Sequence, residues 1–460
     1  MAPAWSLTVV STIGFNLVQP AFGFWRMSCS VSQMGRIDPV ISYGGVSQHV
    51  HKISGASNIN INSTHDSLAA APCTSCQVQA DKSAYWNPQL YYLHSNGQFE
   101  EVPNGGMAVY YLGRGMDAAG GTVAAPFPKG LKFLSGNNNA RSYDADTMTY
   151  GNDNYPSVPV ANRVTFACVD YNNPRPETHY MSDTNCPNGM RAQITFQSCW
   201  DGVNLYKDDQ SHMAYLSGID NGICPPTHPV LLPVLFIEVP YTVSDINQDG
   251  GKFVFANGDE TGYGFHGDFI NGWDIPTLTS AISECLLANE DGVVEECPPL
   301  LVSNDADFAI TCPETSPVYS CEPVHNGISQ LPGCITPTGL GHVVVPSDNT
   351  CPGGNVAACS PNFLNSPPLP FPGNDQYKSL GCYTEPTDAR ALTGNSYSST
   401  TDMTAEACIQ FCAGSKYVAV EYASECYCGS DLNPGSVVAP STECSMTCPG
   451  DRWEYTNSTE

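Results

Sequence analysis

The stretch Asn257–Asp274, NGDETGYGFHGDFINGWD, holds five glycines, four aromatic residues, three aspartates, one glutamate and one histidine, with no lysine or arginine. Glycines at this density permit positive φ and a close approach of the backbone to its neighbours. His266 and Asp268 are two residues apart, so an extended strand projects both side chains from one face. The stretch therefore predicts a polar site walled by aromatic rings. The alternative is a tight, aromatic-packed loop whose histidine only hydrogen-bonds the backbone.

Around this stretch, short β-branched and aromatic runs alternate with turn residues, and helical periodicity is scarce outside Thr277–Leu287. This pattern favours a sandwich or jelly roll over alternating strands and helices. We therefore predict a mainly β fold, with one large β-sandwich or jelly-roll-like domain at 24–336. The expected strands are Val40–Tyr43, Gln89–Leu93, Met107–Leu112, Val164–Val169, Ala192–Gln197 and Val230–Val239.

The composition narrows the range of partners. The 460 residues include 41 glycines and 37 prolines, only 13% are charged, and the formal net charge is −28. A surface this acidic repels phosphate backbones, so nucleic acid is excluded as an expected partner, whereas neutral polysaccharide is tolerated. After the amino-terminal segment no run approaches the roughly 20 apolar residues that span a bilayer, so no transmembrane segment is expected.

The amino terminus predicts secretion. Ala4–Ala21 is mostly apolar and is followed by a small-x-small cleavage site, so residues 1–23 read as a signal peptide. Asn62 and Asn457 begin Asn-Ser-Thr sequons, which predict a glycoprotein. We therefore expect a secreted protein that is extracellular or associated with the cell wall.

Twenty-one cysteines agree with an oxidising compartment, fourteen before residue 380 and seven after it. Cys73 and Cys76 form a CxxC without a second such pair, so disulfide bonding is favoured over metal binding. Four more cysteines lie in a loop-rich extension between 297 and 336. Residues 337–376 are rich in proline, glycine, serine and asparagine and predict an exposed linker before a final module at 377–460.

Several polar clusters are candidates to join His266 and Asp268 in one site. His49 and His51 repeat the i, i+2 spacing, which suits chelation of a transition metal or acid/base chemistry. Asp201 follows Cys199-Trp200 at a turn, and prolines flank His228. We predict His266, Asp268, His49, His51, His228 and Asp201 as catalytic candidates. The candidates for substrate contact are Trp86, Trp200, His212, Tyr263, Trp273 and, in the last module, Tyr383. No GxSxG elbow or HExxH motif is present, and we assign no cofactor and no metal ligand.

Six motifs, in order, resemble a fungal family of secreted proteins classed as a domain of unknown function. They are HVH (His49–His51), SAYWNPQLYY (Ser83–Tyr92), CWDG (Cys199–Gly202), SHMAY (Ser211–Tyr215), THPV (Thr227–Val230) and GYGFHGDFINGWD (Gly262–Asp274). The later LPGC (Leu331–Cys334) resembles the tail of that family. The resemblance implies that these histidines and aspartates belong to one set of motifs, but it implies no activity.

Residues 377–460 resemble a WSC domain, through GCYTE (Gly381–Glu385), MTAEACIQFCAG (Met403–Gly414), AVEYASECYCG (Ala419–Gly429) and CSMTCPG (Cys444–Gly450). The resemblance implies a small, disulfide-rich α+β module that binds cell-wall polysaccharide, with β-glucan as the candidate polymer. WSC domains usually carry eight cysteines. This module carries seven, so one has no partner within it, or pairs elsewhere, or the module is truncated.

Three functional hypotheses follow. In the first, the large domain is a carbohydrate-active enzyme, a polysaccharide hydrolase or lyase with a His/Asp site, and the WSC module anchors it to glycan. In the second, the protein is a non-catalytic, lectin-like or structural component of the wall. In the third, the histidines form a copper or zinc site. Clustered histidines are more than the stacking of sugar rings requires, so the sequence slightly favours the first hypothesis, the carbohydrate-active enzyme.

Overall fold

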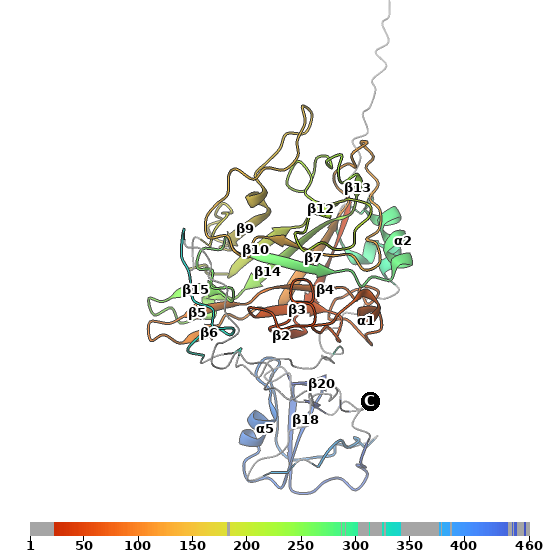
Figure 1. Ribbon diagram of the computed structural model, residues 1–460. Helices are drawn as coiled ribbons and strands as arrows, with labels where there is room; N and C mark the ends of the chain where they lie inside the picture. Colours follow the sequence, from red (N-terminus) through yellow and green to blue (C-terminus); the bar gives the residue numbers. More distant parts are fainter. Residues whose placement is uncertain are drawn as a thin grey trace, which may run out of the picture.

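In the computed structural model the described residues are 23–181, 185–286, 288–289, 291–301, 312, 324–325, 328–341, 377–378, 380–386, 389–439, 444, 446–448 and 455–456. The predicted signal peptide, the Asn457 sequon, most of the linker and Cys321, Cys351 and Cys359 lie outside them. The fold class predicted from the sequence is confirmed, since the chain is mainly β, with several sheets and few helices (Figure 1).

Two five-stranded antiparallel sheets form the large domain (Figure 1). The first has the order β1 (Phe24–Ser30), β7 (Gly106–Leu112), β14 (Val234–Tyr241), β10 (Met190–Thr195) and β9 (Val164–Cys168). The second has the order β2 (Gln33–Gly35), β3 (His51–Gly55), β4 (Ala84–Pro88), β16 (His266–Ile270) and β8 (Lys132–Gly136).

The core lies between the two sheets because alternate residues of each strand point inward. In β1, Trp25, Met27 and Cys29 are buried, while Arg26 and Ser28 are exposed. Phe269 of β16 packs in the same apolar cluster. Gly267 leaves room for the other sheet, since a Cβ at this position would lie 2.8 Å from the Phe196 ring. The remaining residues of β16, which include His266 and Asp268, therefore face away from this core.

Smaller elements complete the large domain. Two three-stranded sheets have the orders β12 (Met213–Ala214), β11 (Cys199–Trp200), β13 (Val230–Leu231) and β15 (Lys252–Phe255), β5 (Leu90–Leu93), β6 (Phe99–Glu101). The helices are α1 (His65–Ala69), α2 (Ile275–Cys285) and α3 (Pro298–Leu301), with 3-10 turns at Val160–Arg163, Val243–Asp245 and Val294–Glu296. None of the helices in the described ranges has the length and apolar character needed to cross a membrane.

One predicted strand is wrong. Val40–Tyr43 forms a turn, because the Asp38 carboxylate accepts hydrogen bonds from the backbone N–H groups of Val40 and Ile41. An aspartate that holds its own backbone in this way competes with strand pairing. The predicted run Val230–Val239 is also divided, into β13 and β14.

Disulfides hold distant parts of the large domain together. Cys73 and Cys76 are both disulfide-bonded, as predicted, but each to a distant partner: Cys76 to Cys29 and Cys73 to Cys312. The other described pairs in this domain are Cys168–Cys186, Cys199–Cys224 and Cys285–Cys297. These links stabilise a loop-rich fold by restricting the unfolded chain.

The C-terminal module has a small core stapled by disulfides. Its elements are β17 (Ser396–Ser398), α5 (Ala405–Phe411), β18 (Tyr417–Glu421), β19 (Glu425–Gly429), β20 (Met446–Thr447) and β21 (Tyr455–Thr456). Thr404 caps helix α5 by accepting from the Ala407 N–H. Cys408–Cys426 and Cys412–Cys428 join α5 to β19, and Cys382–Cys444 closes the module. A core this small needs such covalent support.

Candidate functional site

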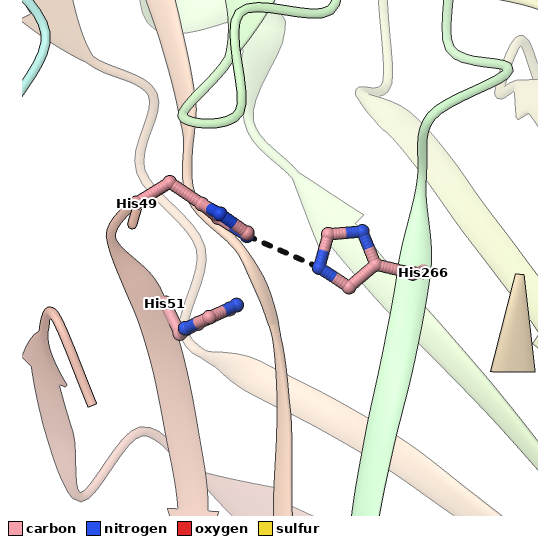
Figure 2. Close-up of side chains that lie close together, drawn as sticks. All are labelled: His49, His51 and His266. Atoms are coloured by element: carbon pink, nitrogen blue, oxygen red, sulfur yellow. Dashed lines mark hydrogen bonds between the residues drawn. The ribbon is translucent and has the colours of Figure 1, made fainter. Parts of the chain in front are cut away.

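Three of the predicted histidines meet on the second sheet. His49 lies two residues before β3, His51 begins β3 and His266 begins β16. Figure 2 shows their rings turned toward one another, with the Nε2 atoms of His49 and His266 3.1 Å apart. The ring centroid of His51 lies 4.3 Å from that of His49 and 5.8 Å from that of His266. We call His49, His51 and His266 the histidine cluster.

Strand order and register explain this meeting. Strand β4 lies between β3 and β16, where Trp86 pairs with Ile53 on one side and with Asp268 on the other. His51 pairs with Pro88, two residues farther along β4. Extending the β16 register by the same two residues brings His266 to the other side of Pro88. Because side chains two residues apart share a face of a sheet, His51 and His266 point to the same side.

The outer ring nitrogens are already held by backbone carbonyls. His51 Nδ1 lies 2.9 Å from the Ile37 carbonyl oxygen, and His266 Nδ1 lies 2.9 Å from that of Gly264. A carbonyl only accepts, so each Nδ1 donates a proton and each Nε2 presents a lone pair. His51 Nε2 is buried and has no hydrogen-bond partner among the described residues. The geometry therefore aims nitrogen lone pairs at the middle of the cluster.

The cluster is dry. His49, His51 and His266 are 6%, 0% and 3% exposed. Burial is the main cause that lowers the pKa of each imidazole, and it lowers the pKa of His266 to about 4. The pKa of His49 is lowered further by the other two histidines and by Arg36 and Arg141. All three imidazoles are therefore neutral near pH 7, the form that binds metal ions.

Asp268 lies on the same strand face as His266, but its setting is apolar. It is 1% exposed, and burial followed by repulsion from Asp38 raises the pKa of its carboxyl well above the ordinary value. Asp38 comes from the loop that precedes β3, and burial raises its pKa to about 6. No motif of the sequence indicated Asp38, although the Asp38-Pro39 pair is typical of a turn.

The other predicted catalytic residues lie elsewhere. His228 contacts the Thr227 hydroxyl and the Ser211 carbonyl oxygen through its two ring nitrogens. Asp201 closes a turn by accepting from the backbone N–H groups of Val203 and Asn204. Burial raises the pKa of Asp201, but these hydrogen bonds and Lys207 lower it to about 2 overall. Neither residue belongs to the histidine cluster.

The predicted substrate-contacting residues are also dispersed. Trp86 is fully buried and pairs with Asp268 across β4 and β16, and its Nε1 has no hydrogen-bond partner in the described part of the chain. Trp273 lies in the sandwich core and donates to the Tyr111 hydroxyl. Trp200 donates to the Asn204 carbonyl oxygen, and His212 contacts that of Lys132. Tyr263 lies beside Tyr180, and Tyr383 bridges to Val438 in the C-terminal module.

A second polar site, absent from the sequence analysis, lies on the outer face of the first sheet. A pocket of about 370 Å³ is lined by Arg26 of β1, Tyr110 of β7 and Glu238 of β14, together with Gln77 and the segment Gly292–Glu295. The Tyr110 hydroxyl donates to Glu238 over 2.8 Å. The alternation of β1, FWRMSCS, was the signal that could have shown these residues as outward-facing.

Comparison with known proteins identifies the chain at the level of a family. It belongs to the family described as "Domain of unknown function (DUF1996)", which matches residues 38–273. A WSC domain matches residues 379–458. Both resemblances seen in the sequence are thus confirmed. The WSC domain and the many disulfides fit an extracellular protein with a carbohydrate-binding, wall-associated role.

Three curated relatives each match a stretch of fewer than 100 residues. A WSC domain-containing protein of Arthroderma benhamiae is 43% identical over 88 residues, 19% of this chain and 12% of that protein. A protein of Chaetomium globosum is 44% identical over 94 residues, 20% of this chain and 41% of the relative. Xylosyltransferase oxt of Drosophila melanogaster is 36% identical over 78 residues, 16% of this chain and 9% of the enzyme. The chain thus spans under half of the length of each relative. No solved structure matches it.

Proposed function

We propose that this is a secreted, wall-directed protein that binds polysaccharide at two places, the WSC domain and the pocket on the outer face of the first sheet. The observation that carries the proposal is the pocket itself. Its 370 Å³ volume falls in the range of small-ligand sites, and it combines an aromatic ring with charged and amide side chains. Sugar rings offer C–H faces to aromatic rings and hydroxyl groups to planar polar side chains.

The residues of the pocket are held in place by neighbouring contacts. Phe24 stacks on Tyr110 with ring centroids 6.3 Å apart, which fixes the tyrosine ring on the sheet. Glu238 is held between the Tyr110 hydroxyl and Arg191, whose nitrogen lies 3.3 Å from the carboxylate. Ala108 pairs with Glu238, and its small side chain leaves the space between Tyr110 and the neighbouring polar groups.

Burial argues against polysaccharide chemistry at the histidine cluster. A general acid or base must come within hydrogen-bond reach of the group it protonates or deprotonates. The three imidazoles and Asp268 are at most 6% exposed, so a polymer chain has no direct access to them. The lectin-like hypothesis is therefore better supported than the hydrolase or lyase preferred from the sequence.

The test uses the full-length protein with insoluble β-glucan, chitin and xylan. Arg26→Ala combined with Glu238→Gln should reduce retention several-fold, and Tyr383→Ala should reduce it through the WSC domain. Lys129→Ala, an exposed lysine outside the pocket, is the matched control. Wild-type retention by the Arg26/Glu238 variant would remove the pocket from the proposal. If the variant and the control weaken retention equally, the effect is not specific to the pocket.

A carbohydrate-active enzyme is the second candidate, because His51, His266 and Asp268 share one sheet face and His49 contacts His266. The same polysaccharides incubated with wild-type protein, with product masses measured, test this candidate. Products that disappear in His266→Ala but not in His228→Ala would establish it over the lectin-like function. The absence of products from every polymer, together with retention, supports binding alone.

A further inference from the structure

We propose that His49, His51 and His266 bind one divalent first-row transition-metal ion, zinc or copper, through their Nε2 atoms. The three residues offer ring nitrogens that lie within 4.8 Å of one another (Figure 2). Zinc–nitrogen bonds are about 2.0–2.1 Å long, so nitrogens on one ion lie roughly 3–3.5 Å apart. The 3.1 Å between the Nε2 atoms of His49 and His266 agrees with this spacing. The site is independent of polysaccharide binding.

The backbone partners of the rings are those of a metal site. Histidines that ligate a metal through one nitrogen almost always donate the other ring N–H to a carbonyl, a carboxylate or water, which fixes ring orientation and tautomer. Ile37 and Gly264 supply such carbonyls for His51 and His266. Both carbonyls lie in segments that abut the cluster, so the sheet and its loops hold the two lone pairs in place before any ion arrives.

A purely structural cluster of histidines accounts less well for the hydrogen bonds. His49 can donate its Nε2–H to the His266 lone pair, which satisfies that pair. The His51 Nε2 lone pair then remains buried without a partner among the described residues. A buried acceptor without a partner has lost the hydrogen bond that water gives it in the unfolded chain, so such an arrangement is disfavoured. An ion at the centre uses all three lone pairs, with His49 in its Nδ1–H tautomer.

The donor set selects the class of ion. Neutral imidazoles suit zinc, copper, nickel and iron, whereas calcium and magnesium prefer oxygen ligands. Three protein ligands leave a further coordination position, which in catalytic zinc sites holds water.

The other grouping of metal-binding atoms in the described residues does not compete. Cys408, Cys412 and Cys426 in the WSC domain also lie within reach of one another. All three are already in disulfides, with Cys426, Cys428 and Cys408 as their respective partners, so they offer no thiolate. A single equivalent of metal is therefore expected from the described part of the chain.

The test is elemental analysis of full-length protein purified without a metal-affinity column, followed by titration with zinc and with copper against a chromophoric chelator. We expect close to one equivalent per chain in the wild type. His51→Ala and His266→Ala should each weaken binding at least about 100-fold, since each removes a ligand rather than an outer partner worth 10–100-fold. Histidine 228 lies outside the cluster, so His228→Ala is the matched control and should bind like the wild type.

Folding is monitored separately, because His51 and His266 are buried. His49→Gln changes the most exposed of the three histidines. In the presence of chelator, the thermal midpoint of this variant should equal that of the wild type. When metal is added, the midpoint of the wild type should rise and that of the variant should not. Cobalt substitution then reports geometry, and copper gives an electron spin resonance spectrum with nitrogen splitting. Less than a tenth of an equivalent of zinc and copper in the wild type, or equal loss in His228→Ala, would overturn the proposal. Neither result bears on polysaccharide retention, so the two proposals fail separately.

Discussion

Lys52→Met should destabilise the large domain strongly, because it leaves a buried carboxylate without its charge partner. Lys52 of β3 and Glu101 of β6 form a salt bridge of 2.7 Å that links two sheets, with the side chains 7% and 17% exposed. His325, from late in the chain, contacts the same carboxylate over 2.8 Å. Removal of one partner of a buried ion pair typically costs about 3–5 kcal/mol.

The pKa of Glu101 gives a similar magnitude for the free energy contributed by its charge partners. Burial raises this pKa, but His325 and Lys52 outweigh burial and lower it from the ordinary 4.5 to about 2. That difference corresponds to roughly 3 kcal/mol of preference for the ionised form in the folded state. Because the folded pKa is depressed, this stability is present above pH 4.5 and is lost as the pH falls toward 2.

Urea unfolding followed by tryptophan fluorescence reports mainly the large domain, where Trp25, Trp86 and Trp273 are buried. We expect Lys52→Met to lose at least about 3 kcal/mol at pH 7. Lys52→Met with Glu101→Gln should recover part of that loss, since no charge remains unpaired. A loss below about 1 kcal/mol for Lys52→Met, the range of exposed pairs, would refute the reasoning. So would a pH profile between 5 and 3 that matches the wild type.

Two further predictions concern the sheet that carries the histidine cluster. Gly267→Ala places a Cβ 2.8 Å from the Phe196 ring and should cost about 1–3 kcal/mol by overpacking, measured by urea unfolding; an unchanged midpoint would mean that the two sheets separate easily. Burial raises the pKa of Asp38 from 3.8 to about 6, so ionisation of Asp38 destabilises the fold as the pH rises from 4 to 6. Asp38→Asn keeps an acceptor for the Val40 and Ile41 N–H groups, so relative to the wild type it should gain up to roughly 3 kcal/mol between pH 4 and 7. Thermal unfolding at both pH values measures this gain, and a constant difference would contradict it.

Much of the local structure was accessible from the sequence. Runs such as Met107–Leu112 and Val164–Val169 became strands because β-branched and aromatic side chains fit a pleated, half-buried surface. The resemblance of the C-terminal module to a WSC domain implied an α+β module, and helix α5 and strand β19 are present there. The predicted strand Val40–Tyr43 was wrong because the Asp38 side chain hydrogen-bonds the backbone of this segment. The pattern of apolar residues does not reveal such a hydrogen bond.

Membership of a sequence motif did not show whether a residue lies in the core or in a site. Trp273 lies in the motif richest in polar groups, yet its ring packs against Trp25 and Tyr111 in the core. Arg26 and Glu238 belong to no motif, yet the first sheet brings both to the lining of one pocket. Whether a tryptophan is in a core or a site depends on which neighbours the fold brings to it, and these neighbours are distant in the sequence.

By itself, the sequence determined the mainly β class, the oxidising surroundings and the division into a large domain and a C-terminal module. It also determined the i, i+2 spacing that put His49 with His51 and His266 with Asp268 on common faces. Only the tertiary structure decided that His49, His51 and His266 meet while His228 stays apart. The physical reason is that a strand's own periodicity fixes which way a side chain points, whereas strand order and register, here β3, β4 and β16, fix what it points at.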